Sequence, residues 1–280
     1  MHSAILFPGA AAQENGKTMN ATHEQITALA QAQFGPTAPA YVSSPAHAKG
    51  ADLQRLLELA APRGDERVVD VATGGGHTAL RFAPHVRSVV ALDLTPGMLV
   101  AAREHIGKHG GTNVTFCRGL AEALPFADGS LDLHLCRIAA HHFADPCSYV
   151  AEAARTLRSG GRFLLADVLG LDDPDLDAFM DRFERWRDPS HVRAYTFAEW
   201  RRLLEMAGFE VEHTERWTRD PYLFEPWTTR MRMPEEERRA LEQWLLAAEP
   251  RFRDFFAITA EDGRVQSLQG SFGIVVACRR

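Results

Sequence analysis

The amino-acid sequence predicts an α/β fold in which a mainly parallel sheet carries helices on both faces. Three observations predict it. An apolar run at residues 68–71 leads into the glycine-rich segment 73–76. A second apolar run at residues 89–92 follows after one helix and stops on Asp93. Strand-like and helix-like segments then keep alternating, which is the pattern of parallel strands joined by helical crossovers.

Apolar spacing and capping residues place the remaining elements. Thr95 is the expected N-cap of a helix that has Pro96 at its first position, and residues 196–199 form a capping-box pattern. Helices are expected at 23–33, 53–60, 78–82, from 96 onward, from 146 to 157 with closure at 159–161, and from 197 to 208. Strands are expected at 67–71, 89–93, 113–117, 131–136, 163–166, 209–213 and 272–277.

Two long segments, 171–195 and 220–268, do not fit this alternation, and together with residues 23–50 they are expected to form a helical lid. Their aromatic residues indicate either an apolar substrate or packing of the lid onto the sheet. These residues are Phe183, Trp186, Trp217, Tyr222, Phe224 and Trp227. Residues 1–22 lack a sustained period and are expected to be flexible, which leaves residues 23–280 as one domain.

Composition argues against several classes of protein. The 280 residues carry a formal net charge of -6 and contain no dense Lys/Arg block, so nucleic acid is not expected as a partner. No apolar run approaches the ~20 residues that span a bilayer. The four cysteines form no C-x-x-C pair, which fits a reducing cytoplasm. The twelve histidines show no H-x-x-x-H pair with a carboxylate at ligand spacing, so no metal site is expected.

The glycine-rich segment and Asp93 together indicate a pocket for an adenosine-bearing cofactor. Glycines let the backbone approach a ligand closely, and Asp93 stands ~20 residues further on, where a carboxylate accepts hydrogen bonds from ribose hydroxyls. His77, directly after the glycines, is expected either to reach a cofactor carboxylate or to lie exposed at the start of a helix. Because Gly74 and Gly76 also fit the dinucleotide fingerprint, the glycines alone do not separate NAD from S-adenosylmethionine (SAM).

Four segments, in this order, resemble successive motifs of the class I SAM-dependent methyltransferases, and most closely the group similar to the ubiquinone and menaquinone biosynthesis methyltransferases. The segments are 68–80, 93–99, 121–126 and 130–132. The resemblance covers residues 34–215 well and the last strand moderately, and it favours SAM over NAD. It implies a Rossmann-like sheet of seven strands in which the last strand is antiparallel.

The resemblance also implies roles for individual residues. Asp70 would orient groups around the methionine part of SAM, Asp93 would hold the ribose, and Met98 would cover one face of the adenine. Ala121 would offer its backbone N–H to the adenine edge. Leu120 stands where the family often has Asp, so the adenine amino group would lose one acceptor. The expected cofactor contacts are Tyr41, Asp70, Ala72, Gly74, Gly76, His77, Asp93, Leu94, Met98, Leu120, Ala121, Glu122 and Arg137.

The catalytic candidates Arg137, His141 and His142 follow the strand at 131–136, at the edge of the sheet where the methyl group should point. They resemble an Arg-x-Ala-x-His-His variant within the group. An imidazole titrates near neutrality, so His141 or His142 would act as a general base. Only one is expected in this role, because neighbours on a regular element diverge. The alternative is a polar pair that caps a helix or binds substrate passively. Arg137 would pair with a substrate acid or with Asp167.

The expected function is transfer of a methyl group from SAM to an oxygen or carbon of a small, partly hydrophobic metabolite, with S-adenosylhomocysteine (SAH) as the product. Two alternatives stay open. One is a SAM-binding regulator or scaffold without transfer activity, which Leu120 would favour. The other is an NAD-dependent oxidoreductase, although no Tyr-x-x-x-Lys group is visible. A cytoplasmic location is expected, and a homodimer is left open.

Overall fold

The fold is that of a computed structural model, which describes residues 11–14, 17–20, 22–36, 38, 42 and 50–280. The α-helices are α1 (His23–Phe34), α4 (Ala51–Ala60), α5 (His77–Phe82), α6 (Pro96–Lys108), α7 (Pro146–Thr156), α8 (Pro174–Arg187), α9 (Phe197–Met206), α10 (Phe224–Arg230), α11 (Glu235–Leu246) and α12 (Pro250–Phe255). The short 3₁₀ helices are η1 (Ala83–His85) and η2 (Ala140–His142). The strands are β1 (Ala11–Glu14), β2 (Lys17–Asn20), β3 (Arg67–Val71), β4 (Ser88–Asp93), β5 (Val114–Arg118), β6 (Leu131–Arg137), β7 (Leu157–Val168), β8 (Phe209–Trp217), β9 (Tyr222–Leu223), β10 (Thr259–Glu261), β11 (Arg264–Leu268) and β12 (Phe272–Arg279).

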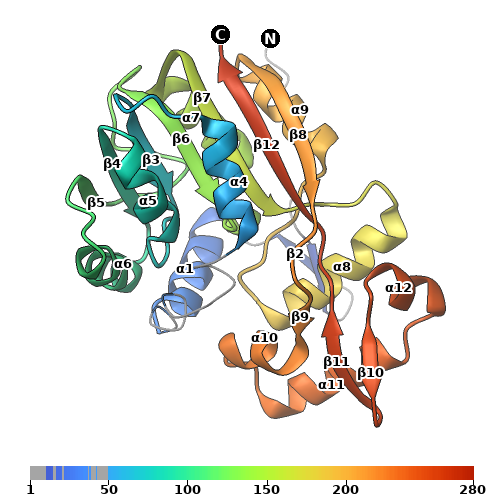
Figure 1. Cartoon of the computed structure of the whole chain (residues 1–280). Helices are drawn as coiled ribbons and strands as arrows, with labels where there is room; N and C mark the ends of the chain where they lie inside the picture. Colours follow the sequence, from blue (N-terminus) through green and yellow to red (C-terminus); the bar gives the residue numbers. More distant parts are fainter. Residues whose placement is uncertain (1–10, 15–16, 21, 37, 39–41, 43–49) are drawn as a thin grey trace.

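Seven strands form the central sheet, in the order β5-β4-β3-β6-β7-β12-β8 (Figure 1). Strands β5, β4, β3, β6 and β7 run parallel, whereas β12 lies antiparallel to both β7 and β8. The predicted mainly parallel sheet with an antiparallel last strand is therefore confirmed. Because parallel strands end at the same edge, the carboxyl ends of β3, β4 and β6 come together, and the segments that follow them can build one site.

Helices cover the two faces of this sheet through separate apolar cores. Val68 belongs to a core with residues of α4, α5 and α6, whereas Val69 and Val71 belong to a core with residues of α7 and α9. Successive residues of a strand point to opposite faces, so the two cores lie on opposite sides of the sheet. Figure 1 shows α4 and α5 in front of the strands. The predicted helical cover on both faces is confirmed.

The turn expected at residues 159–161 is part of β7 instead. Helix α7 ends at Thr156, and Leu157 already has extended backbone. The pairing of β6 with β7 shifts in register between Leu131 and Leu133, where Gly160 takes a φ of 75°. Gly160 and Gly161 therefore lie at an irregularity within a strand and not at the end of a helix. A glycine inside a strand often marks such an irregularity.

The lid has a core of its own. Besides α8, α10, α11 and α12 it contains a small sheet in the order β10-β11-β9, which the prediction of a helical lid did not include because these strands have only two to five residues. Phe183, Phe224 and Trp227 are buried in this lid core. Of the two alternatives for the lid aromatics, packing is thus confirmed for Phe183 and Phe224.

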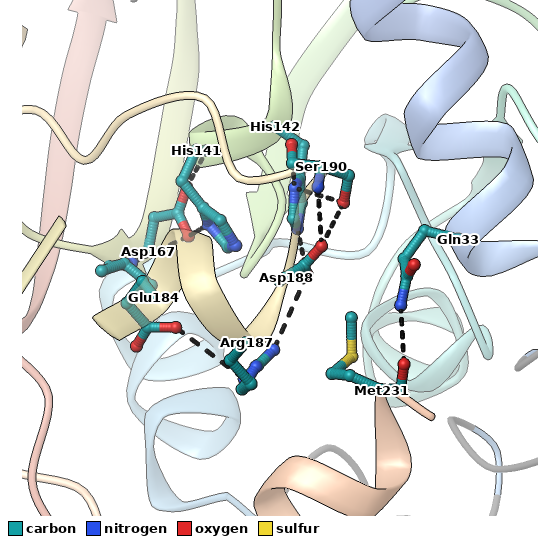
Figure 2. Close-up of polar contacts among 10 residues, drawn as sticks. Gln33, His141, His142, Asp167, Glu184, Arg187, Asp188, Ser190 and Met231 are labelled. Carbon is teal, nitrogen blue, oxygen red and sulfur yellow. Dashed lines mark hydrogen bonds and ion pairs between the residues drawn. The ribbon is translucent and has the colours of Figure 1, made fainter. Parts of the chain in front are cut away.

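Helix α1 connects the sheet to the lid. The Gln31 side chain donates to the Leu94 carbonyl at 3.5 Å, and Gln33 donates to the Met231 carbonyl at 3.1 Å, as Figure 2 shows for the second pair. Within the expected lid segment 23–50, residues 37, 39–41 and 43–49 lie outside the described residues, as do most of residues 1–22, whose flexibility stays a prediction. In the described part of the chain, no helix has both the length and the apolar character that crossing a membrane requires.

Candidate active site

Asp70 forms hydrogen bonds with residues on both sides of the glycine-rich turn between β3 and α5. One carboxylate oxygen, Oδ2, accepts a hydrogen bond from the Thr73 hydroxyl at 2.6 Å and another from the Ala79 backbone N–H at 3.0 Å. Burial raises the pKa of Asp70 to about 7, although both hydrogen bonds act in the opposite direction. Asp70 therefore fixes the turn and the first turn of α5 relative to the sheet.

Gly76 is a position in this turn that tolerates no side chain. Its φ is 80°, and a Cβ there would lie 2.8 Å from Ile106 Cδ1 and 3.1 Å from Ala102 Cβ. We expect Gly76→Ala to lower the free energy of unfolding by ~1–3 kcal/mol through backbone strain and overpacking, measured by urea denaturation. Gly107, near the end of α6, is the control, because a Cβ at that position would meet no atom of the described residues within 4 Å. Gly107→Ala should leave stability unchanged or raise it, and equal losses in both variants would contradict the argument.

Asp93, at the end of β4, faces the same turn. Its Oδ2 accepts from the Gly74 N–H at 2.9 Å, and its Oδ1 accepts from the Thr95 N–H at 2.8 Å. Burial raises the pKa of Asp93 against these hydrogen bonds. A carboxylate has about four acceptor positions, so two backbone donors orient Asp93 and leave capacity for further donors.

A cavity of about 130 Å³ opens above this turn. We call it the glycine-turn cavity. It is lined by eleven of the residues expected to act in the site, namely Ala72, Gly74, His77, Asp93, Leu94, Met98, Leu120, Ala121, Glu122, Arg137 and His142. Asp70, Gly76 and His141 do not line it. Tyr41 lies outside the described residues.

The lining residues that the sequence did not predict include Thr27, Ala30 and Phe34 of α1. Their spacing of three and four places them on one helix face, which was the available signal. His77 is buried and its ring packs edge-on against His105, with ring centroids 4.6 Å apart. The alternative of an exposed histidine at the helix start is therefore wrong.

Arg137 is paired with Asp52 of α4. Its Nε donates to Asp52 Oδ2 at 2.7 Å and its Nη2 to Oδ1 at 3.1 Å, with both side chains buried. Burial alone would raise the pKa of Asp52, but Arg137 reverses the effect and the pKa is lowered. The alternative that Arg137 pairs with Asp167 is wrong, because Asp167 is engaged elsewhere.

Asp167, at the end of β7, holds His141. The two atoms His141 Nδ1 and Asp167 Oδ1 are 2.6 Å apart, and the His141 backbone N–H donates to Asp167 Oδ2 at 2.9 Å. Burial disfavours a charged imidazole here, but the carboxylate outweighs it and the pKa of His141 is raised. This arrangement directs Nε2 away from Asp167 and makes the ring a stronger base than a free imidazole.

His142 has the opposite character. Its Nδ1 lies 2.9 Å from the Ser190 carbonyl oxygen, and burial together with nearby His141 lowers the pKa of His142 to about 4 (Figure 2). The ring is thus neutral near neutral pH. The two rings lie side by side, with centroids 4.0 Å apart. They do not diverge as expected for a regular element, because η2 is a tight 3₁₀ turn.

A second cavity, of about 560 Å³, lies between the sheet edge and the lid. We call it the lid cavity. It shares Phe34, Ile138 and His142 with the glycine-turn cavity, and His141 also lines it. Its other lining residues include Asp52, Glu184, Arg187, Trp217, Arg219, Tyr222, Trp227 and Arg230. In the described ranges, no group of three or more His, Cys, Asp or Glu side chains is placed to hold a metal ion.

Comparison with known proteins decides the family. A family model described as a methyltransferase domain matches residues 69–165. YcgJ of Bacillus subtilis, named as an uncharacterized methyltransferase, is 37% identical over 226 residues, which make up 81% of this chain and 89% of YcgJ. The chain belongs to the class I methyltransferases.

Solved structures resemble this methyltransferase over most of its length. A crystal structure of a proposed methyltransferase from Bacillus halodurans has a TM-score of 0.79 and 41% identity, with 82% of this chain and 99% of that chain covered. The crystal structure of YcgJ has a TM-score of 0.77 and 35% identity, with 82% of this chain and 98% of that chain covered.

A shorter part of the chain is similar in sequence to a named C-methyltransferase. The ubiquinone/menaquinone C-methyltransferase UbiE of Dinoroseobacter shibae is 36% identical over 132 residues, which are 46% of this chain and 52% of UbiE. The family implies that the methyltransferase uses SAM.

The glycine-turn cavity fits this cofactor by its donor and acceptor chemistry. The oriented carboxylate of Asp93 suits a ribose diol, and the side chains of Leu94, Met98 and Leu120 provide an apolar slot for a flat ring. The carboxylate of Glu122 accepts from the Ala144 and Asp145 N–H groups, so it fixes the wall of the cavity after η2.

Proposed function

We propose that this methyltransferase transfers the methyl group of SAM to an oxygen or carbon atom of a small, partly hydrophobic metabolite bound in the lid cavity. The observation that carries the proposal is the junction of the two cavities. Phe34, Ile138 and His142 line both, so a group held in one cavity can reach a molecule held in the other. His141, which is paired with Asp167, lines the lid cavity beside His142.

The cofactor roles follow from the cavity walls. Asp93 accepts hydrogen bonds from the two ribose hydroxyls, the backbone around Gly74 passes close to the amino-acid part, and Met98 covers the adenine. When bound, SAM supplies an electrophilic methyl group on a sulfonium sulfur. The protein contributes alignment of the two reactants, which is worth up to ~7–11 kcal/mol in well-oriented reactions.

His141 is the better candidate for the general base. Its Nδ1 is occupied by Asp167, which leaves Nε2 to take the proton from an acceptor O–H or C–H, and the Asp167 carboxylate then stabilises the imidazolium. The lowered pKa of His142 makes that ring a weak base. With Nδ1 donating to Ser190, His142 offers the Nε2 lone pair as a hydrogen-bond acceptor that positions the substrate. Arg137 lines the glycine-turn cavity and its partner Asp52 lines the lid cavity, so this ion pair lies between the two cavities.

Calorimetry and label transfer test this function. SAM and SAH should each bind with one-to-one stoichiometry, whereas NAD should give no heat. Incubation with methyl-labelled SAM and a panel of phenols, alcohols, enolisable ketones and amines should label oxygen or carbon acceptors. Binding of NAD in place of SAM, or label on amines alone, would contradict the proposal.

A further inference from the structure

Two residues that line the lid cavity each have a buried side-chain polar atom without a hydrogen-bond partner among the described residues. Glu184, on α8, is 4% exposed, and its Oε1 accepts no hydrogen bond from any residue that the structure describes. Trp227, on α10, is 2% exposed, and within the same described ranges its Nε1–H also has no acceptor. Both residues line the lid cavity. One atom is a hydrogen-bond acceptor and the other is a donor.

Buried polar atoms without a partner are rare in folded proteins, because they lose their hydration without replacing it. Another buried carboxylate of the lid is satisfied. Glu242, which is 6% exposed, accepts from Arg264 Nε at 2.8 Å and from the Val265 N–H at 3.0 Å. The lid therefore can satisfy a buried carboxylate, and Glu184 Oε1 differs from Glu242 in this respect.

Glu184 and Trp227 both lie beside Arg187. Arg187 Nη1 lies 3.8 Å from Glu184 Oε2, and the Arg187 Cζ lies 4.9 Å from the centroid of the Trp227 ring. Phe183, the neighbour of Glu184, packs edge-on against Trp227 with centroids 6.0 Å apart. Figure 2 shows Glu184 and Arg187 next to the pair of Asp167 and His141. A ligand group bound beside Arg187 would therefore be next to both residues.

We propose that Glu184 and Trp227 recognise a hydroxyl group of the methyl acceptor, at a position separate from the atom that receives the methyl group. The hydroxyl hydrogen is donated to Glu184 Oε1, and the hydroxyl oxygen accepts from Trp227 Nε1–H. An ether oxygen accepts but does not donate, an ammonium group does not accept, and a carboxylate is repelled by Glu184. A hydroxyl group both donates and accepts, so a single hydroxyl satisfies one donor and one acceptor. This inference rests on the proposed function, because it places the acceptor in the lid cavity.

Matched probes test the inference without knowledge of the natural acceptor. 2-Naphthol and 2-methoxynaphthalene, and cyclohexanol and methoxycyclohexane, are titrated against the SAH-saturated protein, with binding followed by NMR. Each hydroxyl probe should bind roughly tenfold more tightly than its methoxy partner. In Glu184→Met this ratio should fall below about threefold, because only the donated hydrogen bond is lost. Trp227→Phe should weaken both members of a pair about equally, because both oxygens accept.

A matched control separates recognition from folding. Glu184→Met removes a carboxylate whose Oε1 accepts no hydrogen bond and whose Oε2 lies 3.8 Å from Arg187 Nη1, so the melting temperature of the free protein should fall less than in Glu242→Met. Glu242→Met removes a partnered one, so the melting temperature should fall while the hydroxyl preference persists. Equal binding of the paired probes, no binding by either hydroxyl probe, or an unchanged ratio in Glu184→Met would overturn the inference. Failure of SAH itself to bind would contradict the proposed function instead.

Discussion

Replacing Asp93 by Ala should lower the affinity for SAM by at least ~100-fold, because hydrogen bonds from a buried ligand to a charged acceptor are worth ~1.5–3 kcal/mol each. The carboxylate is buried and already oriented by the Gly74 and Thr95 N–H groups. The variant loses both the acceptors for the ribose diol and the brace of the glycine turn. Isothermal titration of SAM and SAH measures the effect.

Two further substitutions make this result specific. Asp93→Asn keeps an oxygen for one hydrogen bond and should retain part of the affinity. Asp132, at the start of β6, is a partly buried carboxylate that binds Arg67 and Arg158 away from the cavity. Asp132→Ala should lower stability and leave SAM affinity within about twofold. Unchanged binding in Asp93→Ala would remove the basis for the cofactor assignment.

Loss of the imidazole in His141→Gln should reduce kcat by ~10²–10⁴ with little change in SAM affinity, as expected when a general base is removed. The pH dependence has a defined sign. A base acts in its neutral form, and Asp167 raises the pKa of His141, so the wild-type rate should increase as the pH rises through a value above that of a free imidazole. Steady-state rates between pH 5 and pH 9 would show this.

Asp167→Asn tests whether the Asp167 carboxylate raises the pKa of the proposed base His141. Without the carboxylate the pKa of His141 should fall, so the rising limb of the pH profile should move to lower pH while the maximal rate decreases. His142→Gln should cost less, because the pKa of His142 is already about 4 and its ring is neutral. A larger loss of kcat in His142→Gln than in His141→Gln would indicate that His142, and not His141, is the general base.

The parts of the fold that depend on local signals were predictable from the sequence. Thr196 and Glu199 form the capping box that their spacing predicts, and Asp145 caps α7 through the Cys147 and Ser148 N–H groups. Asp93 ends its strand beside the glycine turn, as the spacing between them indicated. Such features need only a few neighbouring residues and the period of one element.

Other features depend on residues that are distant in sequence and could not be predicted. Arg137 pairs with Asp52, 85 positions away, and the sequence pattern gives no reason to prefer it over Asp167. The neighbouring rings of His141 and His142 result from a 3₁₀ turn that no periodicity indicates. The burial of Glu184 could not be predicted, because a charged residue on a helix is normally solvated and this burial depends on how α8 packs against the other lid elements.

The pairing of β12 with β8 bears on how this enzyme could change its substrates. Phe272 lies directly opposite Trp217, so the whole excursion of residues 218–271 leaves the sheet and returns to it at one point. An insertion whose two ends meet can grow, shrink or be exchanged without shifting the strands that flank it, since lengthening a closed loop costs little entropy. Residues 218–271 can therefore vary between homologues, and change which acceptor is methylated, while the cofactor-binding part of the fold stays the same. For the same reason, this segment can be exchanged between related enzymes at Trp217 and Phe272.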